Sequence, residues 1–111
     1  MDMMEMMKQA KAVSEKMKSA QEAVEHIQVT GFAGLDEDKV SVCMGGRYQV
    51  SEVSIPAHLM GKNDADSVAF LQDLIAAATN DAVQKVAKET KDRMSNVMGG
   101  LQLPPGFKLP L

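Results

Sequence analysis

Apolar side chains recur along the first 27 residues at steps that alternate strictly between three and four. They stand at Met3, Met6, Ala10, Val13, Met17, Ala20, Val24 and Ile27. This seven-residue repeat places a narrow apolar stripe along one side of a helix. Because no Gly or Pro occurs before Gly31, we expect one long helix from about Asp2 to Glu25. One helix cannot bury the stripe alone, and the pattern leaves open whether a later helix of this chain or a second copy covers it.

The pattern then changes to the alternation that is typical of strands. Short strands are expected over residues 27–32 and 40–44, where apolar and polar positions alternate. Gly45-Gly46 predicts a tight type I′ turn into a third strand over residues 47–55. The apolar parity breaks inside that third strand. It therefore predicts either a bulge near Ser51-Glu52 or a strand that is covered on both faces.

A second long helix is expected after Pro56, which ends the third strand, with Asp64 or Asp66 as its cap. Three consecutive alanines at 76–78 permit a close helix contact. After Ala87 the apolar stripe thins, so the last turns should project from the body. The predicted apolar face comprises Val68, Leu71, Leu74, Ile75, Ala78, Ala82 and Val86.

These elements predict an α+β fold of order α-β-β-β-α, with a three-stranded antiparallel sheet between two long helices. Residues 1–111 form a single domain, in which 99–111 is an extended Pro-rich tail that Gly99-Gly100 separates from the helix. A domain of this size has a small core, so part of the helical apolar surface should be buried by oligomerisation. Ten Met residues and no Trp suit an adaptable interface.

Candidate chemistry is sparse. A single cysteine, Cys43, excludes an internal disulfide and a zinc knuckle, and only two histidines are present. No nucleophile, base and acid stand in a recognisable catalytic arrangement, and Gly45-Gly46 lacks the lysine of a phosphate loop. We therefore expect no enzyme activity, no metal, no cofactor and no small-molecule substrate. The longest apolar runs are too short to span a membrane, and the start does not resemble a signal peptide, so a cytoplasmic location is expected.

Charge is distributed unevenly, although the net charge is only −3. Basic residues cluster on the two predicted helices, whereas acidic residues gather near residues 36–38 and 64–73. Lysines on helices can neutralise phosphates and make DNA affinity dependent on salt. The basic residues of the first helix could also form an ordinary solvated polar face opposite the apolar stripe, with no ligand.

Several strings resemble the YbaB/EbfC family of bacterial nucleoid-associated proteins. The residues that carry the resemblance are Leu103-Pro104-Pro105-Gly106-Phe107-Lys108, the alanine-rich run from Leu74 to Asn80-Asp81-Ala82, Met7-Lys8-Gln9-Ala10, Val29-Thr30-Gly31 and the Gly46 hairpin. The resemblance implies an α-β-β-β-α protomer that pairs into a tweezer-like homodimer. It also implies binding of double-stranded DNA with low or modest sequence preference, in the cytoplasm and in association with the nucleoid.

Position and charge then select the candidate residues. The predicted DNA contacts are Lys8, Lys11, Lys16, Lys18, Lys88, Lys91 and Arg93. The predicted dimer interface comprises Met6, Ala10, Val13, Met17, Ala20 and Val24. An alternative function is a protein-interaction or adaptor module, in which the Met-rich helix and the apolar tail recruit a partner.

Overall fold

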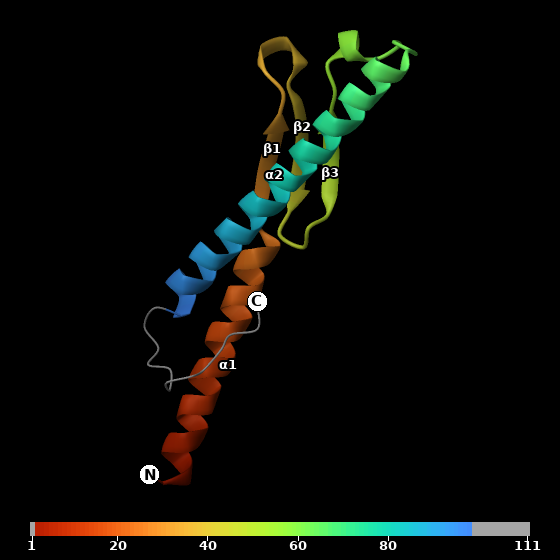
Figure 1. The fold of residues 1–111 in the computed structure, drawn as a ribbon. Helices are drawn as coiled ribbons and strands as arrows, with labels where there is room; N and C mark the ends of the chain where they lie inside the picture. Colours follow the sequence, from red (N-terminus) through yellow and green to blue (C-terminus); the bar gives the residue numbers. More distant parts are fainter. Residues whose placement is uncertain (1, 99–111) are drawn as a thin grey trace.

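The computed structural model describes residues 2–98, and its order of elements confirms the predicted α-β-β-β-α arrangement (Figure 1). The two helices are α1 (Met3–Glu25) and α2 (Ala65–Met98), and two short 3₁₀ turns, η1 (Asp36–Asp38) and η2 (Ala57–Leu59), lie in the connections. The strands are β1 (Gln28–Ala33), β2 (Val40–Gly45) and β3 (Val50–Ser54). The predicted extended tail lies outside the described residues.

Both long helices begin where their caps predict. Asp2 caps α1, because its carboxylate accepts a hydrogen bond of 2.9 Å from the backbone N–H of Glu5. Asp64, the first of the two expected candidates, caps α2 by accepting a hydrogen bond of 3.0 Å from the N–H of Ser67. Hydrogen bonds from Ser67, chiefly from its side chain and then from its backbone N–H, hold the pKa of the Asp64 carboxyl below its usual value.

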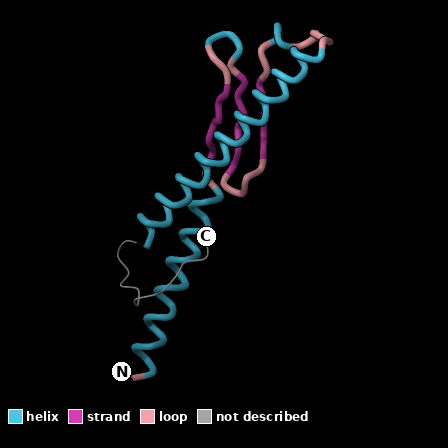
Figure 2. Tube along the Cα trace, in the orientation of Figure 1, coloured by secondary structure: helices cyan, strands magenta, loops and turns pink. Residues whose placement is uncertain are grey.

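The strands form one antiparallel sheet in the order β1-β2-β3, drawn in magenta in Figure 2. Cys43 lies opposite Glu52 whereas the next residue, Met44, lies opposite Val50, so Ser51 is the extra residue of a bulge. The Ser51 hydroxyl donates to the carbonyl of Cys43 at 3.3 Å. The predicted bulge is therefore confirmed. The alternative, a strand covered on both faces, is wrong because β3 is exposed along its whole length.

The hairpin between β2 and β3 differs from the predicted type I′ turn. The N–H of Tyr48 donates to the carbonyl of Gly45, and the N–H of Gly45 donates to the carbonyl of Gln49, each at 2.9 Å. Tyr48, and neither glycine, has a positive φ of 62°. The connection is thus a longer loop, and β3 begins at Val50 rather than at residue 47. Gly46 is needed for space, because a Cβ there would overlap the carbonyl oxygen of Val24.

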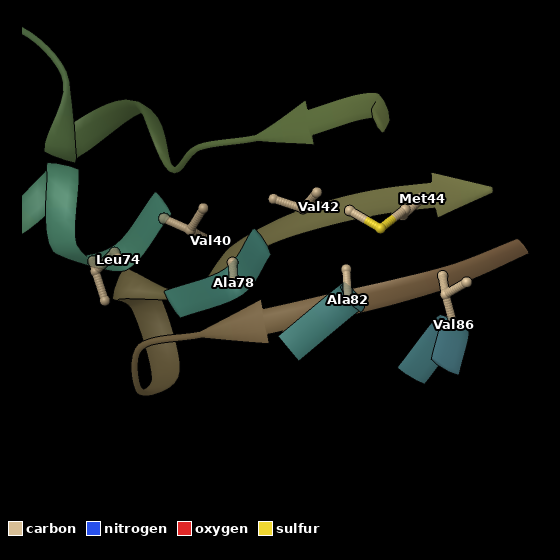
Figure 3. Packing of buried hydrophobic residues seen from close by; sticks show 7 residues of the cluster. All are labelled: Val40, Val42, Met44, Leu74, Ala78, Ala82 and Val86. Carbon is tan, nitrogen blue, oxygen red and sulfur yellow. The ribbon is translucent and has the colours of Figure 1, made fainter. Parts of the chain in front are cut away.

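The core lies between the sheet and α2, which crosses one face of the sheet (Figure 2). Figure 3 shows side chains of β2 and α2 pointing toward one another, namely Val40, Val42, Met44, Leu74, Ala78, Ala82 and Val86. The predicted face of α2 is correct except at Val68, which lies in the first turn and is exposed. Ala78, the last of the three alanines, packs with Ala82 against Gly31 of β1, so this close contact of α2 is with the sheet.

The molecule is elongated, measuring 72 × 23 × 19 Å. Its radius of gyration is 20.5 Å, whereas a compact domain of about 100 residues has about 13 Å. Figure 1 shows the cause: α1 leaves the sheet at one end and extends past the end of α2. The first half of α1 is therefore a projecting arm.

Candidate nucleic-acid interface

The arm is built from the exposed part of α1. Every residue from Asp2 to Ala12 is exposed, whereas the last turns of α1 pack against α2. At about 1.5 Å per residue, the first 15 residues of the helix span roughly 22 Å. The arm is long enough to lie along the surface of a large ligand.

The apolar stripe of α1 is divided between two environments. Met3 and Met6 are 77% and 56% exposed, Val13 and Met17 are half-buried, and Ala20 is only 1% exposed. Among the predicted dimer residues, Met6 and Ala10 are therefore exposed and Val24 is half-buried, whereas Ala20 is covered within its own protomer. The sequence left open whether a later helix or a second copy covers the stripe. In the structure α2 covers its C-terminal end, and its N-terminal end stays uncovered and could contact a second copy.

The predicted DNA contacts on α1 lie on this arm or at its base. At about 100° per residue, Lys8, Lys11 and Lys18 fall within roughly 80° of one another on the side opposite the stripe, and Lys16 lies on the flank. All four lysines are exposed, as are Lys88 and Lys91 on α2. Within residues 2–98, none of these six ammonium groups forms an ion pair with a carboxylate, so all of them are available to phosphate.

Arg93 differs from the six lysines because its guanidinium already has partners. Its Nε donates to Glu89 Oε1 and its Nη1 donates to the carbonyl of Ala23, each at 2.9 Å. The Ala23 carbonyl lies in the last turn of α1, and the negative end of the helix dipole there stabilises a nearby cation. Arg93 thus fastens α2 to the C-terminal end of α1 and fixes where the arm leaves the body.

A further charged group, formed by Asp81 and Lys85 of α2, protects the free edge of β1. Asp81 on α2 accepts hydrogen bonds from the N–H of Phe32 at 2.9 Å and from Lys85 Nζ at 3.0 Å. The Phe32 bond, with the Lys85 bond second, holds the pKa of the Asp81 carboxyl below its usual value. Lys85 also donates to the carbonyl of Thr30 at 2.9 Å. Together they satisfy outward-facing backbone groups that would otherwise invite another strand.

The same group places an aromatic ring among cations. Lys85 Nζ and Lys39 Nζ lie 4.9 and 5.5 Å from the centroid of the Phe32 ring, within the range of cation–π attraction. The sequence offered one signal for this group, the Asn80-Asp81-Ala82 string. Its partner strand lies 49 residues away from Asp81 in sequence, so the pairing could not be inferred from local pattern.

Other kinds of site find no support in the part of the chain that the structure describes. Residues 2–98 contain no group of three or more His, Cys, Asp or Glu side chains arranged to hold a metal ion. Neither of the two described long helices has an apolar segment of the length and purity that crossing a membrane requires.

Comparison with known families assigns the chain to one of them. The sequence model of the YbaB/EbfC DNA-binding family matches residues 1–101. The chain belongs to this family. The match spans α1, the three strands and α2, so the arm and the body both belong to the YbaB/EbfC unit. A YbaB/EbfC chain is a member of a DNA-binding family and not of an enzyme family, which makes DNA its ligand class.

Proposed function

We propose that this protein binds double-stranded DNA as a tweezer-like homodimer and that it acts in the cytoplasm as a nucleoid-associated protein. One observation carries the proposal: the α1 arm presents exposed, unpaired lysines on one side and an uncovered apolar stripe on the other. Lysines without carboxylate partners contact phosphate readily. Because the family is a DNA-binding one, those phosphates are assigned to DNA.

The contacts are mainly to the phosphate backbone, with low or modest sequence preference. Lys8, Lys11, Lys16 and Lys18 are carried by α1, and Lys88 and Lys91 by α2, and none lies in a helix-turn-helix arrangement that would read bases. Arg93 contributes indirectly in this proposal, by holding the two helices together. The affinity should then fall with salt, at a slope of about 0.9 for each phosphate neutralised.

The homodimer rests on surface that a monomer leaves exposed. Met3 and Met6, at the N-terminal end of the stripe, are 77% and 56% exposed. A second copy that packed against the stripe would bury them. The proposed contacts are the exposed Met6 and Ala10 and the half-buried Val13 and Met17, with Val24 at their margin.

The DNA contact is tested by fluorescence anisotropy of a labelled duplex across a salt series. A Lys8→Glu, Lys11→Glu variant should bind more weakly, and its salt slope should be smaller by about 1.8 for each arm engaged. The matched control is Lys39→Glu, Lys62→Glu, which makes the same charge change at exposed positions outside α1 and α2. Equal losses in the two variants, or binding indifferent to salt, would refute the arm as the DNA contact.

The dimer is tested by sedimentation of a Val13→Lys variant. Burying a lysine in the stripe should dissociate the dimer, because an unpaired charge is costly in an apolar contact. Ala12→Lys is the control, since Ala12 is exposed and lies about 120° around the helix from the stripe. A Val13→Lys protein that stays dimeric at the same concentrations removes the stripe from the interface.

The adaptor alternative has one observation in its favour. Met3, Met4, Met6 and Met7 are all more than half exposed, and flexible thioethers suit adaptable protein contacts. If the duplex does not bind at low salt while the exposed Met residues prove necessary for a protein contact, the adaptor function replaces DNA binding.

A further inference from the structure

The loop between β2 and β3 brings polar side chains of a different kind to the base of the arm. Gln28, Arg47 and Gln49 are all exposed, and with Glu25 they line an open pocket of about 380 Å³. The pocket lies at the end of the sheet from which α1 leaves (Figure 1). The proposed contacts on the arm are lysines, whereas this pocket offers one guanidinium and two amides. Arg and Gln side chains can each form two hydrogen bonds to the edge of one base.

Arg47 stands in line with lysines of the arm. Lys11, Lys18 and Glu25 follow one another at intervals of seven residues, so each is displaced by only about 20° around α1 from the one before. Arg47 forms an ion pair with Glu25, which places its guanidinium at the end of this row. Neighbouring members of the row are about 10 Å apart along the helix axis. The major groove is about 12 Å wide, so a duplex with a phosphate at Lys18 can present that groove to Arg47.

Backbone hydrogen bonds hold this loop in place relative to α1. The N–H of Gly46 donates to the carbonyl of Ile27, just after α1, at 3.1 Å. The N–H of Gly45 donates to the carbonyl of Gln49 at 2.9 Å, and Gln28 lies opposite Gly45 in the sheet. A backbone that is already ordered does not have to be ordered on binding, so the loop can present its side chains at low entropic cost.

We propose that Arg47, Gln28 and Gln49 read base edges in the major groove of the duplex that the arm binds, an inference that rests on the proposed function. Arg47 pairs with the O6 and N7 acceptors of a guanine, and a glutamine pairs with the N6 and N7 groups of an adenine. The side chains of Arg47 and Glu25 are 69% and 48% exposed, and so exposed an ion pair contributes little and can open. Because Glu25 balances the charge of Arg47, this group supplies sequence preference rather than net attraction for phosphate.

The inference is tested by fluorescence anisotropy with a duplex that the wild-type protein has selected from a randomised pool. The wild type should prefer it to a scrambled duplex of the same composition by roughly 5-fold or more, the effect of one bidentate contact. Glu25→Ala, Arg47→Ala removes both charges, so it should lose most of this preference while keeping the salt slope. The matched control is Lys62→Ala, Asp66→Ala, which removes a cation and a carboxylate from exposed positions near the start of α2.

Three results would overturn the inference. The pocket does not read bases if the wild type enriches no sequence from the pool, or if the Glu25→Ala, Arg47→Ala variant keeps the full preference. If that variant binds both duplexes more weakly, with a salt slope smaller by about 0.9, Arg47 contacts phosphate instead. Failure of the proposed function looks different, because the wild type would then bind neither duplex at low salt.

Base analogues identify the groove. A selected duplex made with 7-deazaguanine keeps its base pairs but lacks the guanine N7 acceptor in the major groove. The wild type should bind it more weakly than the natural duplex, whereas the Glu25→Ala, Arg47→Ala variant should bind the two equally. In the same way, 7-deazaadenine should weaken the wild type but not a Gln28→Ala, Gln49→Ala variant. Equal wild-type affinity for natural and modified duplexes would overturn reading in the major groove.

Discussion

Replacing Gly31 by alanine should destabilise the protein by about 1–3 kcal/mol, because α2 crosses β1 there without room for a methyl group. A Cβ at Gly31 would overlap the carbonyl oxygen of Ala78 and the amide nitrogen of Ala82, and would lie 2.8 Å from the Cα of Ala82. All three atoms belong to the backbone. No change of side-chain rotamer can relieve the overlap, so the helix must move away from the sheet.

The matched control is Gly45→Ala, a change of the same size in the neighbouring strand. A Cβ at Gly45 would find its nearest atom at 3.8 Å, an ordinary contact. That variant should be neutral or more stable by about 0.4–1 kcal/mol, because alanine loses less backbone entropy on folding. Urea unfolding at one fixed protein concentration measures both free energies. If the two variants unfold within about 0.5 kcal/mol of each other, the argument from helix-to-sheet spacing is refuted.

Three further changes test single interactions. Asp81→Asn keeps an acceptor for the N–H of Phe32 but loses the charge. Because folding lowers the pKa of Asp81, the free energy of unfolding of the wild type should decrease as the pH drops below about 4. Urea unfolding across pH should show a smaller decrease in the variant. Arg93→Met should lower thermal stability while leaving the salt slope of DNA binding unchanged, and a reduced slope would show that Arg93 contacts phosphate. Asp2→Ala should fray the arm, seen as faster amide hydrogen exchange in its first turn, without lowering the urea midpoint, because the residues that follow it are exposed.

The long helices and the bulge could be predicted because their signals are local. A cap at Asp2 or Asp64 lies within three residues of the N–H it accepts from, and the apolar period extends over several turns. The bulge at Ser51 follows from a change of parity within one strand. Each of these features depends on neighbours in sequence, so the residue pattern contains the necessary information.

The hairpin and the role of Arg93 could not be predicted because their causes lie elsewhere in the chain. Gly46 suggested a turn that needs positive φ, but its lack of a side chain serves the approach of Val24, 22 residues earlier. The positive φ falls on Tyr48 instead. The sequence placed Arg93 among the predicted DNA contacts, whereas in the structure its guanidinium donates to a carbonyl 70 residues away in sequence. For the candidate site, the sequence located the lysines correctly on exposed helical surface but could not separate them from a cation already in use.

The geometry of α1 also decides whether dimerisation and DNA binding compete for the same surface. Lys8, Lys11 and Lys18 lie about 160° around the helix from the apolar stripe. Two copies that pair through Met6, Ala10 and Val13 would therefore keep both sets of lysines facing outward. The C-terminal end of the stripe is held by α2, and Arg93 fixes that end, so the rotation of α1 about its own axis is fixed relative to the body. A homodimer formed this way would hold its two sets of arm lysines at a fixed separation set by the two bodies.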